Sequence, residues 1–209
     1  MRKILLLVSI IATFCCSGCM YAVRYDGEYR GKVYDGETKQ PIEGAVVLGI
    51  WNIAHPSPGG SWSEFYDARE TLTNKNGEFS ISGQGVRVLS NMEPMSVMVF
   101  KSGYVPIDSR DWNSFATKET LDGPMFDKIL NRESFPYKYK GNGKKNFLPF
   151  LDSSGVVNFP IRKMEVEEQW TISRPSIPDD KMPSMTDEIN KERIKRGYKP
   201  YTSMRGATK

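Results

Sequence analysis

Few side chains in this sequence could do chemistry at a catalytic or metal centre. The chain contains one histidine, His55, and three cysteines that all precede residue 20. One histidine cannot supply the two imidazoles of a two-histidine metal site. A Ser-His-Asp triad could be built from His55, Ser57 or Ser61, and Asp67, but no nucleophile-elbow sequence accompanies them. We therefore interpret His55 as a surface-loop residue and expect no metal and no cofactor.

The cysteines point to lipid chemistry instead. The chain opens with Met1-Arg2-Lys3, continues with an apolar run over residues 4–14 and then reaches Ser17-Gly18-Cys19. These are the parts of a signal peptide, and the apolar run is too short to span a bilayer. Ser17-Gly18-Cys19 resembles the end of a bacterial lipobox, although Cys16 stands where leucine is usual. The resemblance implies cleavage after Gly18 and a lipoprotein with acyl chains, palmitate among them, on Cys19.

This N-terminus also predicts where the protein is found. Lipidation of Cys19 would tie the mature chain to a membrane of the bacterial cell envelope. Met20 is not the aspartate that retains many lipoproteins at the inner membrane, so we expect the outer membrane, facing the periplasm. The alternative is an ordinary secretory signal cleaved near Gly18. In the lipoprotein no thiol remains for a disulfide or a nucleophile, so the fold depends on its hydrophobic core.

Charge and composition narrow the class further. The formal net charge is +4, and loss of Arg2 and Lys3 with the signal leaves it near +2. That balance is not the footprint of a nucleic-acid-binding protein. Glycine, proline and aromatic residues are plentiful, and long helical periodicity is absent, which favours a mainly β fold with long loops.

Short strands separated by turn signals occupy the centre of the chain. Residues 45–51 form a β-rich apolar run, and Phe79 and Ile81 alternate with polar neighbours. Asn74-Lys75-Asn76-Gly77 is a hairpin signal, since Asn and Gly tolerate positive φ. The spacing predicts a β-sandwich. Its buried side chains should include Val46, Leu48, Phe79, Ile81, Val97, Val99 and Ile161.

Four blocks of this region resemble the carboxypeptidase regulatory-like domain. They are GKVYD at 31–35, PIEGAVV at 41–47, TNKNGEFSI at 73–81 and FKSGY at 100–104, in the order found in that family. The resemblance implies a seven-stranded transthyretin-like β-sandwich and a noncatalytic accessory module. The hydroxyisourate hydrolases share that fold, but they use more than one histidine and end in Tyr-Arg-Gly-Ser. This chain ends in MRGATK, so a hydrolase is the least favoured class.

We divide the chain into four parts. Residues 1–18 are the signal peptide, 19–27 a tether, 28–166 the sandwich with a long insertion at 109–155, and 167–209 a C-terminal arm. A short helix through about Arg196, stopped by Gly197, should end the arm. Met185 and Ile189 share one face of it, and Ile194 lies off that face. Because the helix is weakly amphipathic, we expect it at the edge of the domain or in solvent.

Binding residues are predicted in two long loops. Trp51, Trp62, Phe65 and Tyr66 lie in or beside a loop over residues 52–68, and Tyr139 lies in a basic stretch at 138–145. Such aromatics can stack on a glycan or anchor an envelope protein, and the basic stretch could meet acidic headgroups. Alternatively, the aromatics fold back as a minor core and the basic stretch is a solvated loop. The expected function is a binding or scaffolding module. The second choice is a partner subunit of an envelope enzyme or secretion machine, recognised through the insertion and the C-terminal arm.

Overall fold

The computed structural model describes residues 23–109, 112–115, 117, 149–165 and 175–201. These residues form ten strands, two short 3-10 helices and one α-helix. In chain order they are β1 (Val23–Asp26), β2 (Tyr29–Asp35), β3 (Val46–Ser57), β4 (Gly60–Leu72), β5 (Glu78–Ile81), β6 (Gly85–Val88), β7 (Ser96–Phe100), β8 (Ile107–Ser109), η1 (Trp112–Ser114), β9 (Phe150–Leu151), β10 (Val157–Ile161), η2 (Asp179–Lys181) and α4 (Pro183–Lys195).

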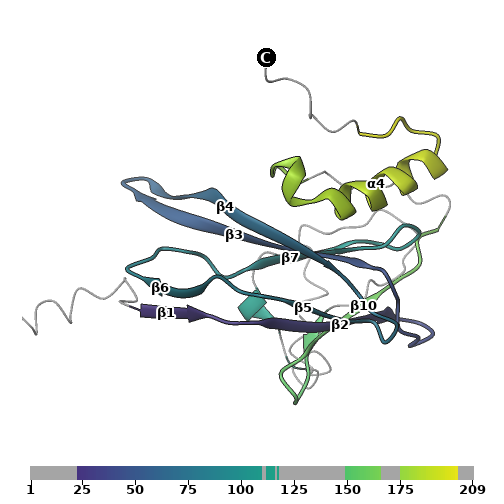
Figure 1. The fold of residues 1–209 in the computed structure, drawn as a ribbon, viewed down its shortest axis with the longest axis horizontal. Coiled ribbons are helices and arrows are strands. Elements are labelled where there is room, and N and C mark those ends of the chain that lie inside the picture. Colours follow the sequence, from purple (N-terminus) through teal and green to yellow (C-terminus); the bar gives the residue numbers. More distant parts are fainter. Residues whose placement is uncertain (1–22, 110–111, 116, 118–148, 166–174, 202–209) are drawn as a thin grey trace, which may run out of the picture.

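The strands build a sandwich of two four-stranded sheets, which confirms the predicted mainly β fold (Figure 1). One sheet has the order β4-β3-β7-β8 and the other β5-β2-β10-β9. β10 runs parallel to β2, whereas the other paired strands are antiparallel. The expected count of seven strands is not exact, because the described residues form ten, two of them in a separate ribbon, β1–β6. β1 lies within residues 19–27, the range that the sequence suggested as a tether.

The main core lies between the two sheets. All seven side chains predicted to be buried are buried, but only five of them lie in this core, because Val46 and Leu48 lie in a second one. Trp112 and Phe115 follow β8 and pack edge-to-face on each other, with ring centroids 5.5 Å apart, against the core residue Phe159. The first residues of the 109–155 insertion therefore belong to the sandwich core.

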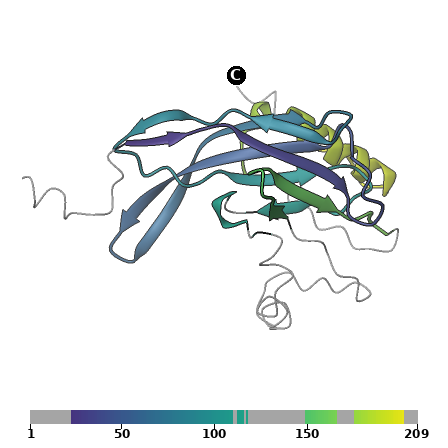
Figure 2. The ribbon, with the colours of Figure 1, turned by 90° about the horizontal axis from the view of Figure 1, so that it is seen from below.

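A second core lies on the outer face of the β4-β3-β7-β8 sheet. α4 covers this face, as both views show (Figures 1 and 2). Its buried members are Val46, Leu48, Ala68, Met98, Phe100, Met182, Met185 and Ile189. The sequence-based placement of this helix at the domain edge or in solvent is wrong. Met185 and Ile189 do share the buried face, and Ile194 is exposed as predicted.

A glutamate of the sheet binds the first turn of α4. The Glu70 carboxylate of β4 accepts the backbone N–H of Ser184 at 2.6 Å and of Met185 at 3.0 Å. Glu70 thus satisfies donors that open the helix, a task usually performed by the N-cap side chain, whereas the N-cap here is Met182. The C-cap is Arg196, and Gly197 follows with φ +78°, which confirms the predicted stop.

Further along α4, two buried glutamates bind the turn after β7. Glu188 accepts the N–H of Ser102 at 3.0 Å, and Glu192 accepts the N–H of Gly103 at 2.8 Å. Arg196 pairs with Glu192 at 2.6 Å. Burial would raise the pKa of each glutamate, but these hydrogen bonds and the neighbouring cations outweigh it and hold both pKa values below the usual range.

The segment predicted as a loop over residues 52–68 is a long antiparallel hairpin. β3 and β4 stay paired to Ser57 and Gly60, which leaves a two-residue turn. Between Trp51 and Asn52 the register shifts, and Tyr66 is the extra residue of that bulge. The hairpin projects beyond the sandwich at the end away from α4, beside the β1–β6 ribbon (Figure 2).

The turn at Asn74–Gly77 joins the two sheets and does not close a hairpin, because β5 pairs with β2 and not with β4. Asn74 Oδ1 accepts the N–H groups of Asn76 and Glu78, at 2.9 and 3.0 Å. Gly77 has φ +73°, and a Cβ there would lie 2.2 Å from the carbonyl oxygen of Val33. Only glycine fits this position.

Several sequence-based predictions lie outside the described residues. These are the signal peptide, Cys19, Tyr139, the basic stretch at 138–145 and much of the insertion. Within the described part of the chain, no helix has the length and apolarity needed to cross a bilayer.

Candidate binding surface on the β3–β4 hairpin

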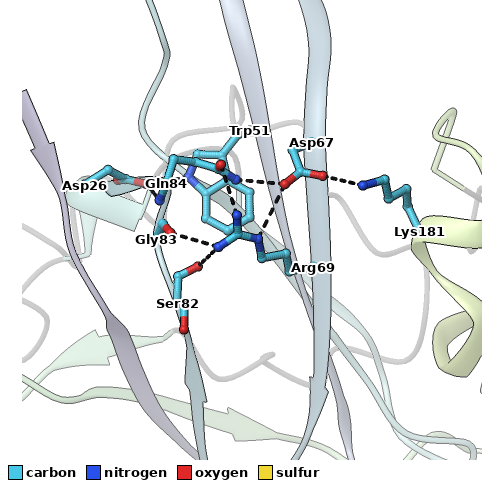
Figure 3. Close-up of polar contacts among 8 residues, drawn as sticks. All are labelled: Asp26, Trp51, Asp67, Arg69, Ser82, Gly83, Gln84 and Lys181. Atoms are coloured by element: carbon cyan, nitrogen blue, oxygen red, sulfur yellow. Dashed lines mark hydrogen bonds and ion pairs between the residues drawn. The ribbon is translucent and has the colours of Figure 1, made fainter. Parts of the chain in front are cut away.

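A polar cluster lies at the base of the hairpin, where β4 meets the segment before α4 (Figure 3). Asp67 accepts hydrogen bonds from Lys181 Nζ at 2.7 Å and from Gln84 Nε2 at 3.0 Å. Arg69 Nε lies 3.4 Å from the same carboxylate. Burial opposes ionisation of Asp67, but the bonds from Lys181 and Gln84 outweigh it and lower its pKa.

The Arg69 guanidinium connects this carboxylate to the chain between β5 and β6. It donates to the carbonyl oxygens of Ser82 and Gly83, at 2.7 and 2.8 Å, and to Gln84 Oε1 at 3.1 Å. Its carbon also lies 5.5 Å from the ring centroid of Trp51. Two carbonyl oxygens, a side-chain amide and an aromatic face therefore hold the Arg69 cation. Its role is to position these parts of the chain relative to one another.

Asp26, at the end of β1, is the buried acid of the cluster. It accepts the indole N–H of Trp51 at 2.9 Å and the backbone N–H of Gln84 at 2.7 Å, and the Tyr29 hydroxyl also donates to it. Burial and the contact with Asp26 raise the pKa of Tyr29, so that phenol stays a donor. All four carboxylate oxygens of Asp26 and Asp67 are engaged within the protein, so the cluster joins β1, β4, β6 and η2 rather than offering groups to a substrate.

The outer half of the hairpin has a different surface. His55 and Trp62 are cross-strand partners whose rings stack at a centroid distance of 4.2 Å and an angle of 16°. His55 Nε2 lies 2.9 Å from Glu64 Oε2, and Ser63 Oγ donates to Glu93 at 2.6 Å. Trp62 is still 54% exposed although the imidazole covers one of its faces. This ring, with the Glu64 carboxylate on the same face of the hairpin, can accept a flat apolar group beside a hydrogen-bond acceptor.

The other aromatics predicted to bind have separate places. Trp51 is fully buried in the core, and Phe65 packs against the cluster beneath α4. Tyr66 is 40% exposed, and the Arg87 guanidinium lies over its ring at 4.5 Å. Tyr139 lies outside the described residues. Trp51 is thus part of the main core and Phe65 packs beneath α4, whereas Trp62 and part of Tyr66 face solvent.

The structure assigns other partners to most members of the imagined triad. His55 pairs with Glu64, Ser57 Oγ donates to the Gly60 carbonyl at 3.0 Å, and Asp67 is bound by Lys181. Sequence reasoning missed the His55–Trp62 pair because residues 52–68 were assigned to a loop. The signal was the two-residue turn at Pro58-Gly59, which places positions 55 and 62 opposite each other once both flanks are strands.

A shallow groove of about 620 Å³ lies elsewhere, on the outer face of β5, β2 and β10. Its walls include Arg30, Lys32, Glu78, Asp152 and Asn158. The charges are mixed, and Asp152 is bound by Asn158 at 2.9 Å. The groove thus favours no particular class of ligand.

Comparisons with known proteins add little to this geometry. No protein-family model matches the chain, and no curated protein matches it. Among solved structures, a match is to the Streptococcal ancillary pilin, with 15% identity and a TM-score of 0.24. The match covers 40% of this chain and a quarter of that chain's length. At that TM-score it carries no argument, so function has to be argued from this molecule's own surfaces.

Proposed function

We propose that this chain is a noncatalytic, lipid-anchored protein of a bacterial envelope whose β-sandwich is a binding or scaffolding module. The N-terminal sequence supports the anchor at Cys19 and the outer membrane as its place, facing the periplasm. The polar cluster of Figure 3 supports the noncatalytic role, since its carboxylates bind donors of the protein itself.

The observation that carries the binding proposal is the His55–Trp62 stack on the projecting hairpin. An exposed tryptophan held by a ring on one face is a preorganised platform, because little side-chain entropy remains to be lost on binding. Glu64, on the same face of the hairpin, supplies a carboxylate acceptor beside it. An envelope glycan or a segment of an envelope protein fits this chemistry.

The test is photo-crosslinking in intact cells that express the full lipidated chain, followed by identification of the captured species. Trp62→Ala should weaken capture by a hairpin probe several-fold, because stacking on an aromatic ring contributes about 1–3 kcal/mol. Tyr198→Ala is the matched control, since Tyr198 is 57% exposed and follows α4. If Trp62→Ala and Tyr198→Ala leave capture equally unchanged, the hairpin is not the binding surface.

The anchor has a separate test. Metabolic labelling with a fatty-acid analogue should label the wild-type chain and not Cys19→Ala. Fractionation should place the labelled chain in the outer membrane. Equal labelling of both chains would reject Cys19 as the lipidated residue, and recovery from the inner membrane would reject the proposed side of the envelope.

A partner subunit of an envelope enzyme or secretion machine is the second candidate. Its recognition was expected through the insertion and the C-terminal arm, but α4 is committed to its own sheet through Met185 and Ile189. That leaves the solvent side of α4, where Ile194 is 61% exposed. Capture of a partner at Ile194 and not at the hairpin would favour this candidate. A hydrolase remains the least favoured class.

A further inference from the structure

The β1–β6 ribbon places apolar side chains outward and polar ones inward. Val23 pairs with Val88 and Tyr25 with Val86, and these four side chains form its outer face. Between 64% and 74% of each is exposed. The inner face carries Arg24, whose Nη1 donates to the Met92 carbonyl at 3.1 Å, and Arg87, which lies over Tyr66. This is the reverse of the usual pattern for a strand pair beside a core.

Asp26 explains why the ribbon keeps this orientation. Side chains alternate along a strand, so a buried Asp26 places Arg24 on the inner face and Tyr25 and Val23 on the outer one. Asp26 is held inside by Trp51 and by the N–H of Gln84. A shift of one residue would bury the valines but would break these bonds. The outward apolar face is therefore fixed by the polar cluster at the base of the hairpin.

The outer face is an apolar patch of four side chains. Single exposed apolar residues are ordinary, whereas a contiguous group on a soluble surface marks a place of contact. Tyr25 adds an aromatic ring with a polar hydroxyl, the kind of side chain enriched where hydrocarbon meets water. The composition suits the boundary of a lipid bilayer.

The position of the patch in the chain selects the occupant. Four residue steps separate Cys19 from Val23, the first residue of β1. A fully extended chain spans at most about 3.6 Å per residue, so Val23 cannot lie more than about 14 Å from an acylated Cys19. We propose that the outer face of the β1–β6 ribbon rests on the headgroup region of the membrane that holds the anchor. This inference rests on the lipidation of Cys19 proposed above.

The depth of this contact is limited by the backbone. In the described structure β1 and β6 pair with each other and with no other strand, so each has an open edge. Open edges do not occur in the hydrocarbon region, because their N–H and C=O groups would lack partners there. The ribbon therefore lies in the headgroup layer with its valine and tyrosine side chains toward the acyl chains, and the anchored sandwich takes one preferred orientation.

The test uses the lipidated full chain in vesicles of phosphatidylethanolamine and phosphatidylglycerol that carry spin-labelled lipid. A single new cysteine can be labelled with bimane, because Cys15 and Cys16 leave with the signal and the Cys19 sulfur is acylated. Bimane at Val86→Cys should be quenched several-fold more than bimane at Gln40→Cys, an exposed residue beyond the far end of β2. Equal quenching at the two sites would overturn the inference.

Two further measurements separate this inference from the proposal it rests on. Mass spectrometry of the N-terminal peptide reports acylation of Cys19. Acylation with equal quenching would overturn the ribbon contact and leave the anchor standing, whereas an unacylated Cys19 would overturn both. Quenching should fall to the Gln40→Cys level in an otherwise identical Cys19→Ala chain that is produced without residues 1–18. If labelling of Val86→Cys in that soluble chain becomes slower as protein concentration rises, a second copy covers the patch, and the membrane contact is wrong.

Discussion

Two strand surfaces of this molecule are apolar on the side that faces away from the sandwich core. The outer face of β3 and β7, with Val46, Leu48 and Phe100, lies beneath α4 and is fully buried. The outer face of the β1–β6 ribbon, with Tyr25 and Val86, is largely exposed. The amino-acid types are similar, so composition does not separate them.

The difference lies in the segment that covers each face. The first face is covered by the chain itself, through a helix that hydrogen bonds Glu70 at its start and the turn after β7 along its length. Within the described residues no segment covers the second face. An apolar strand face therefore indicates that another surface covers it. It does not show whether that surface belongs to the same chain.

The largest effect is expected beneath α4. Phe100→Ala should lower the free energy of unfolding by about 3–5 kcal/mol, because it opens a cavity at a fully buried position. Urea denaturation of a soluble Cys19→Ala chain that is produced without residues 1–18 measures it. Val88→Ala is the matched change on the ribbon and should stay within about 0.5 kcal/mol. Comparable losses would mean that the ribbon face is also covered in solution.

A smaller effect is expected at the start of the covering helix. Glu70→Ala removes the acceptor for the N–H groups of Ser184 and Met185 and should cost about 1–2 kcal/mol, as loss of a helix cap does. Glu64→Ala, in the exposed part of the same strand, is the control and should cost less than about 1 kcal/mol. The denaturation midpoint of Glu70→Ala should be the lower of the two. Equal midpoints would show that Glu70 does not stabilise the start of α4.

The dependence of folding stability on pH should also come from residues at the face that α4 covers. Glu188 and Glu192 have pKa values below those of the unfolded chain, so the unfolded state binds more protons near pH 4. Their contribution to stability is present above about pH 4.5 and is lost as pH falls through the lowered folded-state values. The Glu192→Gln chain should show a weaker fall in melting temperature between pH 6 and pH 3. An unchanged pH profile would contradict this assignment.

The smallest effect on stability is expected at the exposed face. Tyr25→Ser should leave the free energy of unfolding within about 0.5 kcal/mol, since Tyr25 is 74% exposed. It should nevertheless weaken the membrane contact, because it removes apolar surface from the patch. Quenching of bimane at Val86→Cys by spin-labelled lipid, measured in the lipidated chain with and without Tyr25→Ser, tests this. Stronger quenching in the variant would contradict the description of the face.

The sequence predicted which residues are buried better than it predicted what buries them. Val46, Val47 and Leu48 are all apolar. Such a run predicts a buried strand, but it does not tell which side chain faces which side of the sheet. Val47 faces the other sheet, whereas Val46 and Leu48 face α4. Met185 and Ile189 were correctly placed on one helix face, but the surface that receives them comes from strands far away in the chain. Tertiary partners of this kind leave no local signal.

The candidate binding surface was missed in the sequence because the residues around it are typical of loops. Pro56, Pro58 and two glycines favour a loop over residues 52–68, yet they form the end of a paired hairpin. Trp62 was named as a candidate binding aromatic and is exposed, but its pairing with His55 was not foreseen, because it depends on that register. Trp51 can be fully buried because its indole N–H finds an acceptor in Asp26, 25 residues earlier in the chain.

The place of α4 in the chain sets an order on folding. Synthesis releases the strands of the covered face, up to Phe100, well before Pro183, where the helix begins. Until the last part of the chain arrives, Leu48 and Phe100 have no cover, and exposed apolar surface of that kind attracts chaperones or other unfolded chains. A chain cut short before residue 183 would keep every described strand and still fail to finish folding. The C-terminal segment thus decides when a newly made molecule stops being a client of the quality-control machinery.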